Sequence, residues 1–390
     1  MSGASANSRW TDQLLDGMRG LGDPVADAPV AAVLERGGAD AVNELMQTLV
    51  RVDQLVPAQL PDEIQAYLAG SLPLPDWADA GKIKRAEQLF EDWGFLIILC
   101  LFCASLPAAY AAAKGVQVLH LTTRLVTDKR RRVLETGQFL IDVVAVGGLA
   151  DKGKGRRVIQ KVRLMHAAVR HLIKARSEKK PEIWDPDWGT PINQEDLAGT
   201  MLTFSYIVAE PMRRLGVGLP AEDVDAYLHL WNVIGHLLGV CDELMVRDVD
   251  DAKALVDAIR RRQFQASPQG QELTVALLNL LDEMTPLRRF DDTIPPLIRH
   301  LIGDGTADLL LVPKPDPADG LGPLGRIADW GIEHVVGEAE RDLAHHQLMS
   351  TMARPLGREL VHGIFAFERG GERAPFGIPQ HLSRDWELPA

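Results

Sequence analysis

The spacing of apolar residues is the feature of this sequence that most restricts its fold. Between about Gly81 and Ile302, apolar residues recur at intervals of three and four, and the alternation typical of β-strands is nearly absent. This spacing predicts a mostly α-helical protein. The expected helices cover residues 83–106, 115–146, 158–176, 194–215, 221–238, 252–264, 271–284 and 295–301. Asn193 is expected to cap one of them, with Asp196 in its first turn, and Pro268 to begin another.

The chain is expected to form one central helical domain with an extension at each end. Residues 1–78 are rich in Pro, Gly, Asp and Ala, and within them a helix is expected only around residues 41–56. Residues 79–305 make up the central domain, which is long enough to bury a sizeable core. Residues 306–390 begin with a Gly- and Pro-rich connection and are expected to add helices around 327–352 and 356–367, packed on the core.

Charge and composition exclude several classes of protein. The chain has 54 acidic residues against 42 Lys and Arg, and this net charge of -12 argues against binding nucleic acid by neutralising phosphates. Its 3 cysteines cannot form a disulfide framework, and the first ten residues lack the basic and apolar regions of an export signal. The longest apolar run, residues 95–104, falls well short of the roughly 20 residues that span a bilayer. We expect a cytoplasmic protein without a transmembrane segment.

One stripe of basic residues can carry chemistry. On a helix through residues 161–171, Arg163, His166 and Arg170 share one face with apolar neighbours. Two interpretations remain open at this point. The stripe is either a core histidine bonded to a backbone carbonyl beside arginines that pair with acids such as Glu195 and Asp196, or a haem site. In a haem site the imidazole binds the iron, and the arginines face the propionates.

Several segments, taken in order, resemble the sequence pattern of the family that joins latex clearing protein, a rubber oxygenase, with the mycophenolic-acid pathway oxygenase MpaB. They are SLPAAY at 105–110, GGL at 147–149, KVRLMHAAVRH at 161–171, WGTPINQEDLAGT at 188–200, AYLHLW at 226–231 and IGHLLGV at 234–240. The resemblance covers about residues 80–285. It implies a globin-like, all-helical bundle around b-type haem, so that the central domain would be a haem-binding oxygenase domain.

The resemblance also implies roles for the stripe and for the reaction. His166 would be the axial ligand of the haem iron, with Arg163 and Arg170 stabilising the haem pocket. The haem would be bound non-covalently, because the chain contains no Cys-x-x-Cys-His attachment motif. Dioxygen would be the co-substrate, and a carbon–carbon double bond in a small, hydrophobic, isoprenoid-like molecule would be oxidised and cleaved. The oligomeric state is not predicted.

A second segment that resembles the family differs from it at one position. The sequence RVLET matches the family's Arg-x-x-Lys-Thr segment at Arg132 and Thr136, but Glu135 replaces the lysine, which in the rubber-cleaving branch lies on the distal side of the haem. In addition, residues 104–127 contain no acid to match the glutamate base of that branch. Arg132, Glu135 and Thr136 are therefore candidate catalytic residues, and Thr136 is also a candidate cofactor contact. Glu135 would take a proton from an allylic carbon or assist oxygen chemistry, or would pair with an arginine at the surface.

The remaining candidates favour structural roles. His229 and His236 are seven residues apart, too far along a helix to meet at one metal ion, so hydrogen-bonding roles are expected. Cys100 and Cys103 have redox spacing but lie in the apolar run, where we expect small core residues. The adjacent pair His345 and His346 cannot share a helical face. The functional alternatives are a haem enzyme that catalyses hydroxylation, peroxide-driven oxidation or rearrangement, a non-catalytic haem or lipid-binding protein, and a helical scaffold without a cofactor.

Overall fold

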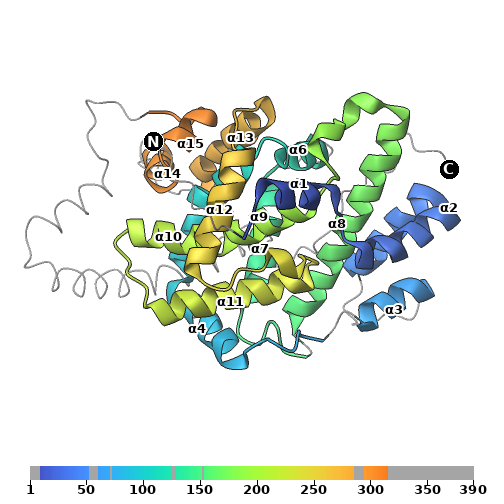
Figure 1. Ribbon diagram of the computed structural model, residues 1–390, viewed down its shortest axis with the longest axis horizontal. Coiled ribbons are helices and arrows are strands. Elements are labelled where there is room, and N and C mark those ends of the chain that lie inside the picture. The colour runs from blue at the N-terminus through green and yellow to red at the C-terminus, as the bar shows by residue number, and fades with distance from the viewer. Residues whose placement is uncertain are drawn as a thin grey trace, which may run out of the picture.

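The computed structural model describes residues 9–51, 60–70, 73–124, 129–151, 153–284 and 294–314, and within these ranges it contains helices and no strand. This confirms the all-α prediction (Figure 1). In chain order the elements are α1 (Asp12–Gly20), α2 (Pro24–Arg51), α3 (Asp62–Gly70), α4 (Ala80–Cys100), the π-helical turn η1 (Leu101–Ser105), α5 (Leu106–Ala111), α6 (Val116–Arg124), α7 (Lys129–Val144), α8 (Lys154–Lys179), the 3-10 turns η2 (Pro181–Ile183) and η3 (Pro186–Trp188), α9 (Gln194–Phe204), α10 (Tyr206–Arg214), α11 (Ala221–Leu237), the 3-10 turn η4 (Asp242–Leu244), α12 (Val249–Gln263), α13 (Pro268–Met284), α14 (Ile294–Ile302) and α15 (Asp304–Leu309).

The core is centred on α4 and α11, which pack along one another, with α9 and α10 against them. Trp231 on α11 is 1% exposed and stacks on Phe204, with ring centroids 5.0 Å apart. The hydroxyl of Tyr227 donates to the Phe204 carbonyl at 3.0 Å, so the polar atom of this buried ring is satisfied. The stacked ring of Trp231 and the bonded hydroxyl of Tyr227 therefore join α11 to the end of α9.

The apolar run of the sequence lies in the middle of this core. Ala80–Ala111 is long and apolar enough to cross a membrane by length and composition, but 72% of its most apolar window is buried inside the protein. The Asp79 side chain caps α4 by accepting from the backbone N–H groups of Gly81 and Lys82. The helix widens into the π-helical turn η1 just before Pro107, which has no N–H to continue the α-helical ladder. Burial on this scale supports the prediction of a core helix.

One of the expected helices is divided, and another is described as two separate elements. The segment expected at 194–215 is interrupted at Ser205. The Ser205 hydroxyl donates to the Met201 carbonyl, and the hydroxyl of Ser105, from the π-helical turn η1, donates to the Thr203 carbonyl. Such side-chain bonds to the last turn of a helix compete with its continuation. The segment expected at 115–146 forms α6, which packs on α13, and α7, which packs on α8. The prediction of a single helix was wrong at 194–215, while residues 125–128, between α6 and α7, lie outside the described residues.

The N-terminal residues contain more structure than the sequence pattern predicted. Instead of one helix near residues 41–56, they form α1, α2 and α3; α2 bends at Gly37 and Gly38, where the backbone is not helical. Figure 1 shows α2 and α3 at one end of the molecule beside α8, and α2 packs along α8. This packing brings acids of the N-terminal residues next to the basic stripe. The helices expected at 327–352 and 356–367 lie outside the described residues.

Candidate functional site

The helix α8 presents His166 toward the main body of the protein. Residues three, four and seven positions away share its face, and these apolar neighbours are at most 6% exposed: Ile159, Val162, Val169 and Ile173. The opposite face of α8, with Leu164, Ala167 and Ala168, packs against α2 and α3. His166 itself is only half-buried. A half-buried imidazole therefore lies among buried apolar side chains.

Arg163, one turn before His166, forms a two-pronged ion pair with Asp23. Its Nε lies 2.5 Å from one carboxylate oxygen, and its second terminal nitrogen lies 2.8 Å from the other. The Asp23 side chain is 4% exposed and that of Arg163 is 12% exposed. The pairing raises the pKa of the Arg163 guanidinium, although burial acts in the opposite direction. A direct contact between Arg163 and a cofactor stays a prediction, because in this structure its main partner is an acid of the protein.

Arg170, one turn after His166, is almost completely buried, with 1% of its surface exposed. It pairs with Asp27, and it donates to the carbonyls of Pro191 at 3.0 Å and Ile192 at 2.9 Å. All three guanidinium nitrogens thus bond to protein acceptors. A role of Arg170 in stabilising the haem pocket stays a prediction, because in this structure its donors bond to Asp27 and to two carbonyls of the protein.

The acids that pair with the stripe differ from those that the sequence analysis considered. Pairing with acids was one of the two interpretations, but the partners are Asp23 and Asp27 rather than Glu195 and Asp196. The reason is topological, since the two aspartates lie about 140 residues before the arginines and approach them only when α2 packs on α8. No local pattern in the sequence signals such a pair.

The segment at 188–200 joins several elements around this helix. Ile192 has a positive φ of 52°, and the carbonyls of Pro191 and Ile192 turn toward Arg170. The Asn193 side chain accepts from the Asp196 N–H at 3.0 Å, which confirms the predicted cap of α9. The Gln194 amide donates to the carbonyls of Gly22 and Gly239. The residues that resemble the family in this segment are therefore also the residues whose hydrogen bonds position α8 and α9.

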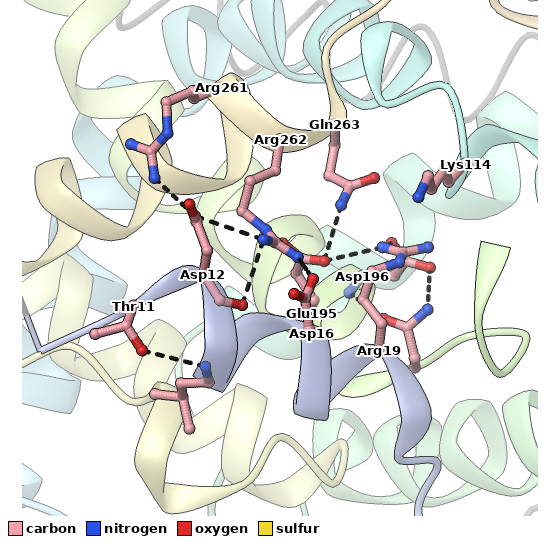
Figure 2. A network of polar contacts seen from close by, with 12 residues as sticks. Thr11, Asp12, Asp16, Arg19, Lys114, Glu195, Asp196, Arg261, Arg262 and Gln263 are labelled. Carbon is pink, nitrogen blue, oxygen red and sulfur yellow. Dashed lines mark hydrogen bonds and ion pairs between the residues drawn. The ribbon is translucent and has the colours of Figure 1, made fainter. Parts of the chain in front are cut away.

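Glu195 is the centre of a buried polar network between α1, α9 and α12 (Figure 2). Its side chain is 0% exposed and accepts from Arg19 at 3.0 Å, Arg262 at 2.9 Å and Gln263 at 2.9 Å. Arg19 also binds Asp196 at 3.0 Å, and burial raises the pKa of Asp196 despite this pairing. Charged hydrogen bonds on both carboxylate oxygens compensate the loss of solvation of Glu195. The network fastens the first helix of the chain to the core.

The segment resembling the family's Arg-x-x-Lys-Thr pattern lies on α7, which packs against α8. Thr136 is half-buried, and Phe139 and Leu140 beside it are part of the main core. The side chains of Arg132 and Glu135 lie outside the described residues. Their catalytic roles therefore stay predictions, while the helix that carries them is next to the helix of His166.

His229 and His236 form a surface arrangement around Trp77. The indole ring contacts both imidazoles edge-on, with ring centroids 5.8 and 5.7 Å apart. His229 Nε2 accepts from the Asp79 N–H at 2.8 Å, and His236 Nδ1 lies 3.5 Å from Asp242. A hydrogen-bonding role, as predicted, is present for His229, although the side chain is only half-buried. Within the described part of the chain, no group of three or more metal-ligating side chains is found.

We expect His229 to make the stability of the protein depend on pH. Burial, together with the charge of Lys82, lowers the pKa of His229, and its bond from Asp79 requires the neutral ring. The unfolded chain then binds more protons than the folded one, so stability decreases as the pH falls below about 6.5, the ordinary value for histidine. The test is thermal denaturation of the cofactor-free protein at pH 7.5 and at pH 5.5. The decrease in stability from the higher to the lower pH should be smaller in His229→Gln than in the wild type. An equal loss in both proteins would contradict this role.

Cys100 and Cys103 are core residues, as expected. Both are completely buried, and burial raises the pKa of the Cys103 thiol to about 12 and raises that of Cys100 as well. Thiols held in the protonated form are poor nucleophiles and poor metal ligands. The pair therefore contributes packing and not redox chemistry. His345 and His346 lie outside the described residues.

Comparison with known proteins decides the class of the protein. A family model of the catalytic domain of the ER-bound oxygenase mpaB/B′ and rubber oxygenase matches residues 88–330. The chain belongs to this family. It is therefore an oxygenase. The match extends past residue 285, where the recognised resemblance ends, and it runs from within α4 through α15.

Two relatives extend the comparison. The rubber oxygenase of Streptomyces sp. (strain K30) is 28% identical over 304 residues, which are 75% of this chain and 71% of the relative. The structure of latex clearing protein LCP in the closed state matches with a TM-score of 0.65 and 23% identity, covering 99% of this chain and 92% of that one. The likeness in fold thus also includes the N-terminal residues, which the sequence resemblance did not cover.

Proposed function

We propose that this oxygenase uses haem b to cleave a carbon–carbon double bond in a hydrophobic, isoprenoid-like substrate. The observation that carries the proposal is His166, a half-buried imidazole among apolar side chains of α8, within a chain that belongs to the mpaB and rubber oxygenase family. The name of the relative, rubber oxygenase, supports a substrate built from isoprene units.

The residues around His166 fit a haem group. A neutral imidazole is a common axial ligand of haem iron, and the packed apolar side chains of Ile159, Val162 and Ile173 suit a flat hydrophobic ring system. His166 would hold the iron, and Thr136 on the adjacent α7 would contact the cofactor. Bound haem supplies the activation of dioxygen. The chain supplies the ligand, a fixed orientation of the ligand helix and surroundings that exclude water.

The proposed reaction balances without an external reductant. One carbon–carbon double bond and one molecule of dioxygen are consumed, and two carbonyl groups are formed. Glu135, in the position where the family has lysine, would serve as the base that takes a proton from an allylic carbon and returns it to the products, so that the reaction neither gains nor loses a proton. Because this replacement departs from the rubber-cleaving pattern, we propose a small isoprenoid rather than the polymer as substrate. The reaction would take place in the cytoplasm.

The proposal is tested on protein expressed with a haem precursor and incubated with geranylgeraniol or squalene under ¹⁸O₂. We expect a Soret band, a b-type pyridine haemochrome, and aldehyde or ketone fragments whose carbons sum to those of the substrate and which carry ¹⁸O. Anaerobic incubation is the control and should give no fragments. A colourless protein after haem supplementation would contradict the cofactor. A hydroxylated product with an intact carbon skeleton would contradict cleavage.

A further inference from the structure

Two acids at the start of α2 bind the helix of His166 on both sides of the imidazole. Asp23, directly before α2, pairs with Arg163, and Asp27 in its first turn pairs with Arg170. The two arginines are seven residues apart on α8, and His166 lies between them, three residues from one and four from the other. Both pairs are thus one helical turn from the candidate ligand.

The two acids are also linked to one another and to the residues around them. The second carboxylate oxygen of Asp27 accepts from the Asp23 N–H at 3.1 Å, so the two acids form one unit. His171 Nε2 lies 3.8 Å from the first oxygen of Asp27, and burial lowers the pKa of this histidine. Arg170 additionally bonds to two carbonyls ahead of α9. The rotation of α8 about its own axis is therefore fixed from two sides.

Two glycines leave the space that these ion pairs occupy. A Cβ atom at Gly22 would lie 2.7 Å from an oxygen of Asp27 and 2.9 Å from Nε of Arg170. A Cβ atom at Gly239, whose φ is +91°, would lie 2.3 Å from an oxygen of Asp23 and 2.7 Å from Nε of Arg163. Each ion pair thus lies directly against the backbone of a glycine, and a side chain at that position would separate the acid from the arginine. The close contact of both pairs with glycine backbone is a second observation that their positions are fixed.

We propose that Asp23 and Asp27 are positioning residues for His166, acting through Arg163 and Arg170, so that the N-terminal helix α2 forms part of the haem site. The inference rests on the proposed function for the identity of the group that His166 binds. An orienting residue acts on a metal ligand by fixing its direction, and loss of such partners typically costs 10–100-fold in metal affinity. Because these acids act through another residue, we expect an effect of about 10-fold on haem affinity.

The two pairs differ in their surroundings, and this difference predicts a graded effect. Asp23 and Arg163 line an open cleft of about 1060 Å³ between α2, α3 and α11, whose walls also include Tyr67 and Leu237. In the second pair Asp27 is 22% exposed, against 4% for Asp23, but the cation left without its acid when Asp27 is lost, Arg170, is only 1% exposed, against 12% for Arg163. Charges are weakened by solvent where it reaches them, so loss of Asp27 should have the larger effect.

The experiment compares four single variants of the full chain with the wild type. Asp23→Asn and Asp27→Asn remove one charge each, whereas Gly22→Ala keeps every charge and displaces the Asp27 pair by its added methyl group. Asp223→Asn is the matched control, because Asp223 pairs with Arg85 at 2.5 Å and is 21% exposed, against 22% for Asp27, but lies on α11 away from α8. Gly22→Ala also keeps the test decisive if an aspartate variant does not fold.

The first measurement is amide hydrogen exchange of the cofactor-free proteins, followed by mass spectrometry of peptides from residues 159–173. We expect faster exchange there in Asp23→Asn, Asp27→Asn and Gly22→Ala, and no change in Asp223→Asn. The second is a haem titration, in which the dissociation constant should rise about 10-fold for Asp27→Asn and less for Asp23→Asn, with a shifted Soret band. Exchange and spectra equal to those of Asp223→Asn would overturn the inference.

The two measurements separate this inference from the proposed function. If the wild type takes up no haem, the proposed function fails, and the exchange of residues 159–173 still decides whether α2 holds the helix of His166. If the wild type binds haem and the variants keep its exchange rates, affinity and spectrum, the proposed function stands and the positioning role is overturned.

Discussion

Replacing His166 with alanine should abolish stable haem binding and, with it, oxygen-dependent cleavage of the substrate. The imidazole is the proposed iron ligand. The other polar side chains on that face of α8, Arg163 and Arg170, carry guanidinium groups that pair with Asp23 and Asp27, so neither can replace it as a ligand. Loss of a direct ligand should weaken binding by well over about 100-fold, the upper end for loss of an indirect partner. The Soret band and product formation measure the two effects.

The control for this prediction is His236→Ala. His236 lies on α11 at the surface, with 37% of its side chain exposed and Asp242 at 3.5 Å, and should affect neither the spectrum nor turnover. Added imidazole should restore part of the Soret band in a His166→Gly variant, because it supplies the missing ligand. An unchanged spectrum in His166→Ala would show that another residue binds the iron.

Replacing Glu195 with alanine should destabilise the protein by about 3–5 kcal/mol, the cost of removing one partner of a buried ion pair. Its carboxylate is 0% exposed and accepts from Arg19, Arg262 and Gln263 together (Figure 2), so the substitution removes an acceptor that these three side chains share and leaves Arg19 with Asp196 and Arg262 with Asp16. The measurement is urea unfolding of the cofactor-free protein. Glu195→Gln, which keeps the size and one acceptor oxygen, should lose less stability than the alanine variant.

The control for Glu195→Ala is Asp12→Ala, which changes a residue of the same network at the surface. Asp12 binds Arg261 at 2.9 Å, but both side chains are 62% exposed, and exposed ion pairs contribute little to stability. Asp12→Ala should therefore leave the unfolding midpoint nearly unchanged. If Glu195→Ala and Asp12→Ala had equal effects, the buried network would not be what fastens α1 to the core.

Local signals in the sequence predicted the parts of the fold that depend on neighbouring residues. Asn193 caps α9 because its side chain reaches an N–H group three residues ahead, and Pro268 begins α13 because its missing N–H is not needed there. The apolar run at 95–104 is part of a buried helix. The same local signals could not locate the break at Ser205, where α9 ends and α10 begins within one apolar pattern.

In the candidate site, too, some features follow from the local sequence and others only from tertiary packing. The spacing of Arg163, His166 and Arg170 places them on one helical face, and this follows from the helix period alone. By itself the sequence thus determined the helical class, the caps and the stripe, and its ordered motifs indicated the family. Only the tertiary structure decided that Asp23 and Asp27 bind the stripe while Glu195 serves another network. Ion pairs between residues about 140 positions apart depend on how helices pack, and packing leaves no periodic trace in either segment.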